Sequence, residues 1–556
     1  MNQISIELLG LIFWMTLFLS ALLIPVAIEL AKKVGAMDIP KHRSMHKVPK
    51  PRLGGLAISI SLLAVCLFFL TLNTPVIAFI TGLLVIVITG VVDDIKQISP
   101  ILKLVGQIVA AILFVYLSDL RVEYVGDIFG LGEIYLNEIS FVVTVFFSVG
   151  MINALNLADG LDSLAGGISA IALIFFGYFA WNSDQTWLLV IAVSLLGAIF
   201  GFLRFNSYPT RSFMGDNGSM MLGYVLAVMF VSLGHSSQQP LSSLAMVVAL
   251  PLLDTIIVMG RRIYNGHNPF HSDRTHLHHC LIDLGLPHPE AVALIYLMMF
   301  CFGLLAISIR NEPDWVIFAS LIGVGVFIFS SIWLAQSAGV HYNHLKTNKL
   351  DSIRQLDALK SIAYGFKVTA QPIGAIILVA LLLPALFAPL FTLSSDRALL
   401  LCAMLVLLVF LTFRIRRAGD LSIVHGILFL CLFSLLFVYK LSSLIYPSWL
   451  GEYINLLSAI ALAWVALKLF FTKYSQIIFA ADFELLILLF SGFIAYVLME
   501  DLSASSLILQ AIQHAFLLAI PFLLVMKINI HNYGQTRKLL FPIILTLVIV
   551  LARASA

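Results

Sequence analysis

The sequence predicts an all-α polytopic integral membrane protein. Of the 556 residues, 61% are hydrophobic and only 11% are charged, whereas soluble globular chains carry about 25% charged residues. Apolar runs of about 18 residues or more recur from one end of the chain to the other, and each is long enough to cross a bilayer as a helix. The net charge of +3 gives no indication of a nucleic-acid partner.

The apolar runs divide the chain into two membrane modules joined by a polar segment. Residues 1–335 are predicted to hold about 11 transmembrane helices, residues 336–369 form a polar cytoplasmic linker, and residues 370–556 form a C-terminal transmembrane module of about 6–7 helices without an assigned function. The spans predicted for the first module are 5–31, 54–71, 75–92, 100–119, 138–155, 164–181, 186–204, 218–234, 241–260, 290–309 and 316–335. Those of the second lie near 370–391, 398–413, 421–441, 453–471, 478–499, 503–526 and 539–552.

Basic residues gather in one set of alternate loops, which predicts the orientation of the chain. The opposite loops are short and carry little beyond Arg121 and Arg310. Because cytoplasmic loops are enriched in Lys and Arg, the basic set is predicted to be cytoplasmic and the N-terminus to lie outside. The basic loops of the first module contain Lys32, Lys33, Lys41, Arg43, Lys47, Lys50, Arg52, Lys96, Lys103, Arg204, Arg211, Arg261, Arg262 and Arg274.

Two adjacent carboxylates, Asp93 and Asp94, stand at the end of an apolar run. Acidic side chains at a membrane boundary are costly unless something pairs with them. Ser99 and Pro100 are suited to begin the next helix, which places Lys103 one turn inside it and on the same membrane surface. A carboxylate pair beside a fixed cation indicates a site for a metal ion, a phosphate or both. A helix end that reaches water is the alternative.

The stretch NALNLADGLDSLAGG, residues 153–167, repeats a polar side chain at every third position. Neighbouring members of such a series share a helix face, and the glycines let the helix break and a ligand approach the backbone. A group of caps for the next helix is the alternative, but one cap needs only one such residue. We therefore expect a polar pocket lined by Asn153, Asn156, Asp159 and Asp162.

The stretch SFMGDNGSMMLG, residues 212–223, places Asp216 between Gly215 and Gly218, just before an apolar run. The glycines permit a tight turn, and the helix that follows offers backbone N–H groups to an anion. Hard cations such as Mg²⁺ take oxygen ligands and keep substrate phosphates in their coordination shell. Asp216 is therefore a candidate ligand of a divalent cation held against a phosphate. A plain helix-starting turn is the alternative.

The stretch NPFHSDRTHLHHCLIDLG, residues 268–285, contains four histidines, an aspartate and an arginine within nine residues. Protonatable imidazoles together with Arg274 suit a diphosphate. A zinc site is the alternative for His276, His278 and His279, although no paired Cys or Glu motif accompanies them.

A basic loop precedes the second predicted span. It reads KHRSMHKVPKPRLGGLAISI, residues 41–60, and Gly54 and Gly55 open the span. Positive charge here is expected of any cytoplasmic loop, and contact with anionic lipid headgroups would explain it equally well. Lys47 in this loop is a candidate substrate-binding residue.

In this order, the five segments resemble the polyprenyl-phosphate N-acetylhexosamine-1-phosphate transferase superfamily (glycosyltransferase 4 family). The resemblance covers about residues 1–335 and includes the paired aspartates, N-x-x-N-x-x-D-G-x-D, F-M-G-D-x-G-S-x-x-L-G and a histidine loop. The histidine loop DRTHLHHCLIDLG is more similar to the bacterial WecA/TagO branch than to the peptidoglycan branch, MraY. The chain departs from both by its extra C-terminal module and by Ser163, where many relatives have glycine and where we expect serine to be tolerated.

The resemblance implies Mg²⁺-dependent transfer of N-acetylhexosamine-1-phosphate, above all GlcNAc-1-phosphate, from a UDP-sugar to polyprenyl (undecaprenyl) phosphate. The reaction would take place on the cytoplasmic face of the bacterial inner membrane, release UMP and initiate a cell-surface glycan. Mn²⁺ would be a substitute cofactor. Phospho-MurNAc-pentapeptide transfer is the alternative within the same class, and a lipid-linked sugar transporter or a silent scaffold are the alternatives outside it. Whether the protein forms a homodimer stays open.

The resemblance also implies a role for each motif. Asp216 would be the principal Mg²⁺ ligand with Asn156 as a second, and Asp93 and Asp94 would be carboxylates of the catalytic centre. Because a phosphate monoester is largely dianionic near neutrality, we expect the lipid phosphate to displace UMP directly, without a covalent aspartate intermediate. The implied substrate-binding residues are Lys103, Asn153, Asp159, Asp162, Arg274, His276, His278, His279 and Lys47.

Overall fold

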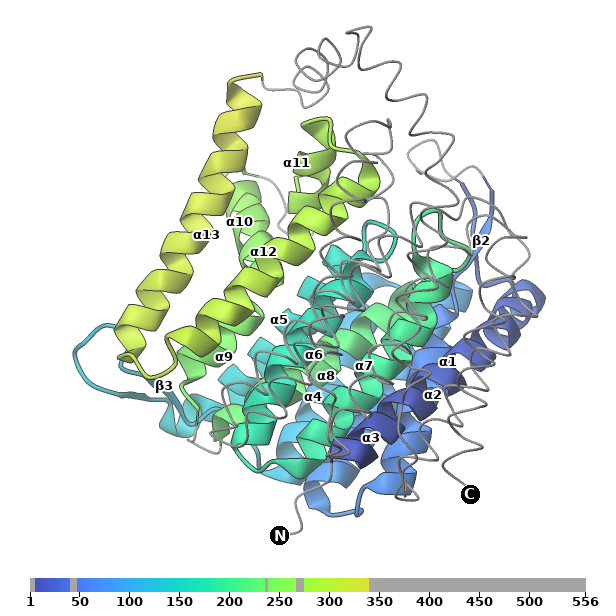
Figure 1. Cartoon of the computed structure of the whole chain (residues 1–556), viewed down its shortest axis with the longest axis horizontal. Helices are drawn as coiled ribbons and strands as arrows, with labels where there is room; N and C mark the ends of the chain where they lie inside the picture. The colour runs from blue at the N-terminus through green and yellow to red at the C-terminus, as the bar shows by residue number, and fades with distance from the viewer. Residues whose placement is uncertain (1–5, 41–47, 236–238, 267–274, 340–556) are drawn as a thin grey trace, which may run out of the picture. The chain divides into compact units, whose positions relative to one another are not determined.

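The computed structural model describes residues 6–339, with the exception of 41–47, 236–238 and 267–274 (Figure 1). Lys47, Arg274, most of the predicted linker and the whole predicted C-terminal module lie outside the described residues. The helices are α1 (Ile6–Val34), α2 (Gly54–Phe69), α3 (Thr74–Lys96), α4 (Pro100–Ser118), α5 (Ser140–Ala158), α6 (Leu164–Asn182), α7 (Thr186–Asn206), α8 (Gly215–His235), α9 (Leu241–Val247), α10 (Ala249–Tyr264), α11 (Leu277–Asp283), α12 (His288–Ser308) and α13 (Asp314–Ser337). Two short antiparallel ladders pair β1 (Met37–Asp38) with β2 (Lys50–Pro51) and β3 (Tyr124–Gly126) with β4 (Ile134–Tyr135).

The predicted all-α polytopic membrane fold is confirmed. Within the described part of the chain, nine helices are long and apolar enough to cross a bilayer, or ten if α9 and α10 are one broken span. Every predicted span of the first module coincides with a helix, but two of them differ from a simple crossing. Helix α2 has 16 residues and is therefore about 24 Å long, and the predicted span 241–260 is divided between α9 and α10, whose axes differ by 79°. The count of about 11 crossings stays a prediction.

Helices α6 and α8 form the centre of the bundle. In each of them 94% of the most apolar window is buried, against 17% in α13. Helix α8 packs on α3, α5, α6 and α2, and this close packing depends on small residues at the contact. A Cβ on Gly223 of α8 would lie 2.6 Å from the Cα of Ile152 in α5. Because α8 touches so many helices, its first turn is held from several sides.

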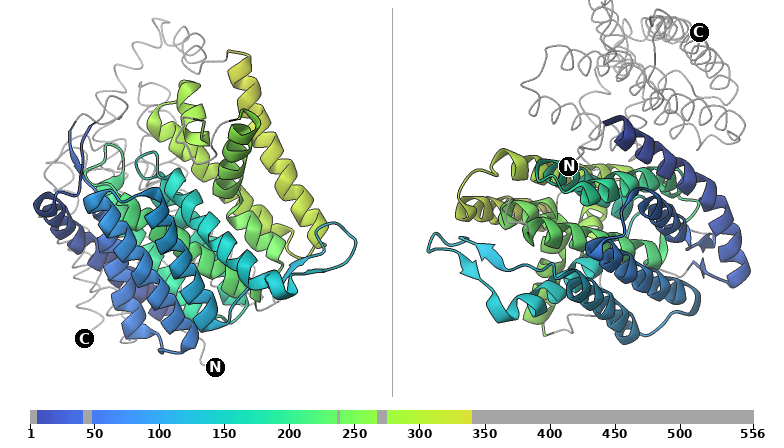
Figure 2. Two further views of the ribbon diagram at one scale, coloured as in Figure 1. Left: turned by 180° about the vertical axis from the view of Figure 1, so that it is seen from behind. Right: turned by 90° about the horizontal axis from the view of Figure 1, so that it is seen from below.

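The polar motifs come together at one end of the bundle. Short connections make consecutive helices run in opposite directions, so the turns α3–α4, α5–α6 and α7–α8 all lie at that end. Helices α3, α5 and α7 end there, and α4, α6, α8 and α12 begin there, beside β2 and α11. The β3–β4 hairpin lies at the opposite end of the bundle, as both Figure 1 and Figure 2 show. As predicted, Ser99 caps α4, with its hydroxyl oxygen accepting from the N–H of Leu102 at 3.3 Å, and Pro100 is the first helical residue.

Candidate active site

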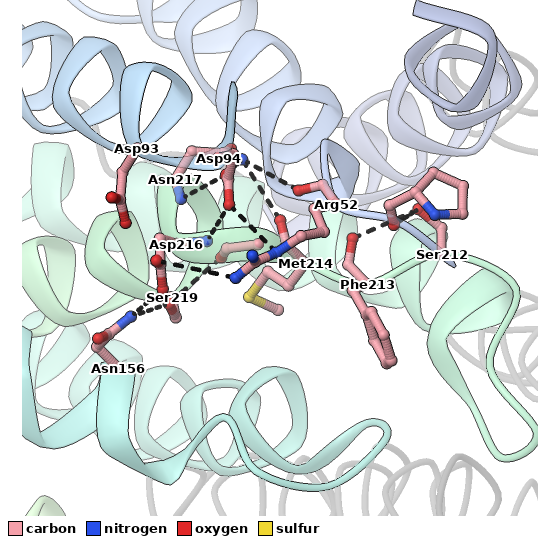
Figure 3. Close-up of polar contacts among 12 residues, drawn as sticks. Arg52, Asp93, Asp94, Asn156, Ser212, Phe213, Met214, Asp216, Asn217 and Ser219 are labelled. Atoms are coloured by element: carbon pink, nitrogen blue, oxygen red, sulfur yellow. Dashed lines mark hydrogen bonds and ion pairs between the residues drawn. The ribbon is translucent and has the colours of Figure 1, made fainter. Parts of the chain in front are cut away.

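Asp216 lies in the first turn of α8, where its carboxylate meets side chains from three other segments. Two of these side chains, Asn156 and Arg52, are seen in Figure 3. Asn156, at the end of α5, donates its amide N–H to Oδ1 at 2.8 Å. The Lys103 ammonium, in the first turn of α4, lies 3.0 Å from Oδ2, and the Arg52 guanidinium lies 3.9 Å from the same oxygen. About a quarter of the Asp216 side chain, 24%, remains exposed, so a ligand can reach it.

Lys103 links Asp216 to a second carboxylate. Its Nζ lies 3.3 Å from Oδ2 of Asp93 and donates to Oδ1 of Asn156 at 3.3 Å. Oδ1 of Asp93 accepts from the backbone N–H of Ile98 at 3.0 Å, which fixes the turn between α3 and α4. The Lys103 ammonium therefore contacts the carboxylates of both Asp93 and Asp216. The predicted association of Asp93 with Lys103 is therefore present, and Asp216 joins it.

Asp94 has the geometry of a helix cap. Its Oδ1 accepts from the N–H of Asp216 at 2.9 Å, and its Oδ2 accepts from the N–H and the side-chain amide of Asn217 at 3.1 and 2.6 Å. The first N–H groups of a helix have no partner within the helix, and a carboxylate there also stabilises the helix dipole. The side chain has no exposed surface. Asp94 thus holds the turn that carries Asp216 and is closed to reactants, a geometry that does not support the catalytic role predicted for it.

The turn before α8 requires glycine at position 215. Gly215 has a φ of +77°, which L side chains rarely adopt. A Cβ there would overlap the carbonyl oxygen of Arg52 and lie 2.6 Å from Oδ2 of Asp94. The glycine of the F-M-G-D motif therefore allows the backbone to pack closely against the carboxylate of Asp94. We call this carboxylate, together with those of Asp93, Asp216 and Asp159, the acidic cluster.

Arg52 is a site residue that the sequence analysis placed only among the basic loops. The backbone that follows it is paired with the turn before α8, because the N–H groups of Gly54 and Gly55 donate to the carbonyls of Phe213 and Met214 at 3.1 and 2.8 Å. This pairing aims the guanidinium at the acidic cluster (Figure 3). One feature of the sequence could have identified Arg52: it stands two residues before Gly54 and Gly55, which anchor the loop to the turn before α8.

The contacts of the Arg52 guanidinium are loose. Its Nε lies 3.7 Å from Oδ1 of Asp94, and its terminal nitrogen lies 3.9 Å from Oδ2 of Asp216. Both distances exceed those of a hydrogen bond. Arginine has five N–H donors suited to phosphate oxygens, so Arg52 is placed to bind an incoming phosphate.

The two asparagines of the N-x-x-N pattern have structural partners. Asn153 and Gln107 exchange amide hydrogen bonds of 2.7 and 3.3 Å, which ties α5 to α4. The amide nitrogen of Asn156 donates both to Asp216 and to the Ser219 hydroxyl, each at 2.8 Å, and its oxygen accepts from Lys103. Asn156 therefore presents a donor to Asp216, an arrangement that does not support its predicted role as a second metal ligand.

Asp159 and Asp162 lie in the turn between α5 and α6 and differ in their surroundings. Asp159 is half-buried, and burial together with the Asp216 carboxylate raises its pKa to about 7. Asp162 instead fixes the connection between α7 and α8, because its Oδ2 accepts from the N–H of Thr210 at 3.0 Å. Its own N–H donates to the ring of His288 at 3.0 Å. Of the two, Asp159 belongs to the acidic cluster.

Ser163 adopts the backbone conformation that glycine favours. Its φ is +67°, which explains why glycine suits this position. Its N–H donates to Oδ1 of Asn206 at 2.9 Å, and its carbonyl accepts from the Tyr296 hydroxyl at 2.7 Å. The serine is accommodated, as predicted, but in a strained conformation.

The histidine segment packs against the same turn. A Cβ on Gly160 would overlap the His278 imidazole, so the ring occupies space that only glycine leaves open. Burial, with His279 and His276 nearby, lowers the pKa of His278 to about 3. His278 is therefore neutral near pH 7, and its contact with a diphosphate stays a prediction. Nδ1 of His276 lies 2.9 Å from Oδ2 of Asp254. Asp254 lies in α10 and could not be recognised as a site residue from the sequence, because it stands alone in an apolar run.

The oxygen donors of the site suit Mg²⁺ better than zinc. Within the described residues, no group of three or more His, Cys, Asp or Glu side chains is arranged to hold a metal ion. Mg²⁺ does not need such a group, because it binds through one or two carboxylates and keeps water and substrate phosphates. Asp93 and Asp216, whose carboxylates both contact Lys103, fit that requirement.

Comparisons with known proteins identify the family. Residues 76–234 match the model of glycosyl transferase family 4. The chain is 32% identical over 308 residues to the probable undecaprenyl-phosphate N-acetylglucosaminyl 1-phosphate transferase of Bacillus subtilis (strain 168), which covers 55% of this chain and 86% of that protein. It is 35% identical over 334 residues to the decaprenyl-phosphate N-acetylglucosaminephosphotransferase of Mycolicibacterium smegmatis, covering 54% and 81%. It is 29% identical over 325 residues to the undecaprenyl-phosphate alpha-N-acetylglucosaminyl 1-phosphate transferase of Escherichia coli (strain K12), covering 56% and 86%.

The matched residues contain the helices that build the site. The family model spans α3 to α8, which carry Asp93, Lys103, Asn156 and Asp216. Most of the length of each relative aligns with this chain. The chain therefore belongs to glycosyl transferase family 4, the family of polyprenyl-phosphate N-acetylhexosamine-1-phosphate transferases.

Proposed function

We propose that this protein transfers N-acetylglucosamine-1-phosphate from its UDP derivative to a polyprenyl phosphate, giving polyprenyl diphosphate-N-acetylglucosamine and UMP. The observation that carries the proposal is the cluster at the start of α8, where Asp93 and Asp216 share Lys103 and Arg52 lies beside them. The names of the Bacillus, Mycolicibacterium and Escherichia relatives support the amino sugar and the polyprenyl acceptor.

The main obstacle to this reaction is repulsion between two anions. A lipid phosphate is largely dianionic near neutrality, and the donor carries a diphosphate. Lys103 and Arg52 would offset this repulsion and stabilise the negative charge that develops on the leaving phosphate. Lys103 is held by contacts to Asp93, Asn156 and Asp216, so it need not reorganise during the reaction.

The bond changes are those of a direct displacement. An oxygen of the lipid phosphate attacks the phosphorus that bears the sugar, the bond from that phosphorus to the bridging oxygen breaks, and UMP leaves with that oxygen. Asp93 would orient the lipid phosphate or accept its remaining proton. Asp94 would act only through the turn it caps. Asp159, with a pKa of about 7, is partly protonated at neutrality and adds less negative charge beside the diphosphate.

Mg²⁺ is part of this proposal, with Asp216 and Asp93 as the residues that would hold it. Bound there, it would supply further positive charge and polarise a phosphoryl oxygen. Mn²⁺, which also takes oxygen ligands, would substitute for it.

The proposal places the site at the cytoplasmic surface of the bacterial inner membrane, with the N-terminus outside. Support comes from charge, because loops at the site end carry Lys50, Arg52, Lys96 and Arg211, whereas the hairpin end carries Arg121 and Arg310. In that position a lipid phosphate would lie at the level of the loops, and the membrane itself would supply proximity.

A donor panel tests the proposal. The full chain, purified in detergent with undecaprenyl phosphate and Mg²⁺, is supplied in turn with UDP-GlcNAc, UDP-GalNAc and UDP-MurNAc-pentapeptide, and released UMP and lipid-linked sugar are measured. We expect UDP-GlcNAc to give both products. Product from UDP-MurNAc-pentapeptide alone would establish the alternative transferase, and absence of product from every donor would overturn the proposal.

A further inference from the structure

We propose that Asp254 is a positioning residue for this reaction, because it orients the imidazole of His276 toward the donor. The inference rests on the proposed function. Asp254 and His276 are 8% and 5% exposed, so both groups are removed from bulk water. Buried charged side chains are retained where a partner satisfies them, and here the partners are specific.

The two oxygens of Asp254 have different partners. Oδ2 lies 2.9 Å from Nδ1 of His276, and Oδ1 accepts from the backbone N–H of Leu277 at 2.8 Å. A carboxylate is a hydrogen-bond acceptor, so this contact favours the tautomer in which Nδ1 is the donor. The carboxylate thereby fixes both the ring plane and the tautomer, and Nε2 is the nitrogen left to meet a ligand.

A second contact, between His278 and Gly160, holds α11 against the turn between α5 and α6. His278 fills the space beside Gly160, and the rings of His276 and His278 lie 6.0 Å apart and within 8° of parallel. Gly160 follows Asp159, which interacts electrostatically with Asp216 and Arg52. The pair of rings is thus fixed between α10 and the α5–α6 turn, next to the acidic cluster that would receive the diphosphate.

A purely structural explanation would make Asp254 a cap for α11 and nothing more. The two roles are separable because they use different partners. The hydrogen bond to the Leu277 N–H survives when His276 is replaced, whereas orientation of the ring does not. A double-mutant cycle between Asp254 and His276 therefore distinguishes them.

The experiment uses the full chain with UDP-GlcNAc, undecaprenyl phosphate and Mg²⁺. We expect Asp254→Asn to lower kcat/KM about tenfold, in the range seen when the partner that orients a functional histidine is lost. In a His276→Ala background the same substitution should change kcat/KM less than about twofold, because the ring is already absent. Asp283→Asn, an exposed carboxylate at the end of the same helix, is the matched control and should leave kcat/KM unchanged.

Equal losses from Asp254→Asn in both backgrounds would overturn the inference and leave a capping role. Thermal unfolding of each variant shows whether it is folded. If the asparagine variant is not folded, Asp254→Ser, which keeps one oxygen for the Leu277 N–H, replaces it in the cycle.

If wild-type protein transfers no sugar phosphate from any donor, the proposed function fails separately from this inference. The cycle is then read from the dissociation constant of UDP-GlcNAc, where additive losses would again overturn the inference.

Discussion

At the residue scale, Arg52 shows how a side chain without a motif can complete a site. Its guanidinium lies within 4 Å of carboxylate oxygens of Asp94 and Asp216, yet too far for hydrogen bonds. Arg52→Ala should raise the KM for UDP-GlcNAc about tenfold, since a charge-assisted hydrogen bond contributes about 1.5–3 kcal/mol. Arg52→Lys should recover part of the loss. Initial rates over a range of donor concentrations measure this, with Lys33→Ala, an exposed residue at the end of α1, as the control. An unchanged KM in Arg52→Ala would exclude Arg52 from donor binding.

Ser163 carries local backbone strain that a single substitution should relieve. A φ of +67° costs an L-residue about 1–2 kcal/mol, a cost that glycine avoids. Glycine in turn loses about 0.5–1 kcal/mol, because its unfolded chain has more conformational freedom. Ser163→Gly should therefore stabilise the protein by about 0.5–1 kcal/mol, and Ser163→Val should destabilise it. Thermal unfolding in detergent measures both. A lower melting temperature for the glycine variant would show that the serine contacts matter more than its φ.

Asp159 should make stability depend on pH. Because burial raises its pKa from the ordinary 3.8 to about 7 in the folded state, the folded protein binds the proton more tightly than the unfolded chain. Stability from this group is therefore fully present below about pH 4 and is lost as the pH rises through about 7. Without Mg²⁺, the melting temperature of the Asp159→Asn variant minus that of the wild type should increase between pH 5 and pH 8, because only the wild type loses stability. A difference that stays constant over this range would place the pKa of Asp159 in the folded protein below about 5.

At the element scale, the two adjacent aspartates should separate into a structural and a functional residue. Asp94 accepts three hydrogen bonds from the start of α8, and asparagine offers only one oxygen. Asp94→Asn should therefore lower the unfolding free energy by about 1–3 kcal/mol. Asp93→Asn keeps one oxygen for the Ile98 N–H, so it should lower the unfolding free energy less than Asp94→Asn does, and it should lose most of kcat. Thermal unfolding and kcat of both variants give the test, and the reverse pattern would assign catalysis to Asp94.

The helices were predictable because each apolar run has the length and composition of a span. The 79° bend between α9 and α10 was not, since residues 241–260 read as one continuous apolar run. Helix α9 packs mainly against α12 and α13, whereas α10 packs mainly against α5. These different partners are set by tertiary packing, which a single apolar run does not encode.

The roles of polar side chains were predictable only in part. The motifs named Asp93, Lys103, Asn156, Asp159 and Asp216 as candidate site residues, and the structure joins four of them, Asp93, Lys103, Asn156 and Asp216, by direct contacts. They could not show that Asp94 binds the backbone of α8, or that Asn153 and Asp162 bind other parts of the protein. Whether a polar side chain meets a ligand or a distant backbone group depends on the three-dimensional neighbours, and the residue type is the same in both cases.

At the scale of the whole molecule, the aligned relatives account for little more than half of the chain. Each alignment covers 54–56% of this protein but 81–86% of the relative. The site is built from segments between Arg52 and His278, which lie in five separate motifs and are held by the packing around α8. The transferase site therefore needs the first module as a unit, because its charged groups come from so many elements.

The most direct test of this account is the fate of one phosphorus atom. Purified protein is given undecaprenyl phosphate, Mg²⁺ and UDP-GlcNAc labelled with ³²P in the phosphate attached to the sugar. If Lys103, Arg52 and the acidic cluster promote attack on that phosphorus, label and sugar pass together into the lipid fraction while unlabelled UMP is released. Label that remains in water-soluble UDP while the sugar alone becomes lipid-linked would contradict the account.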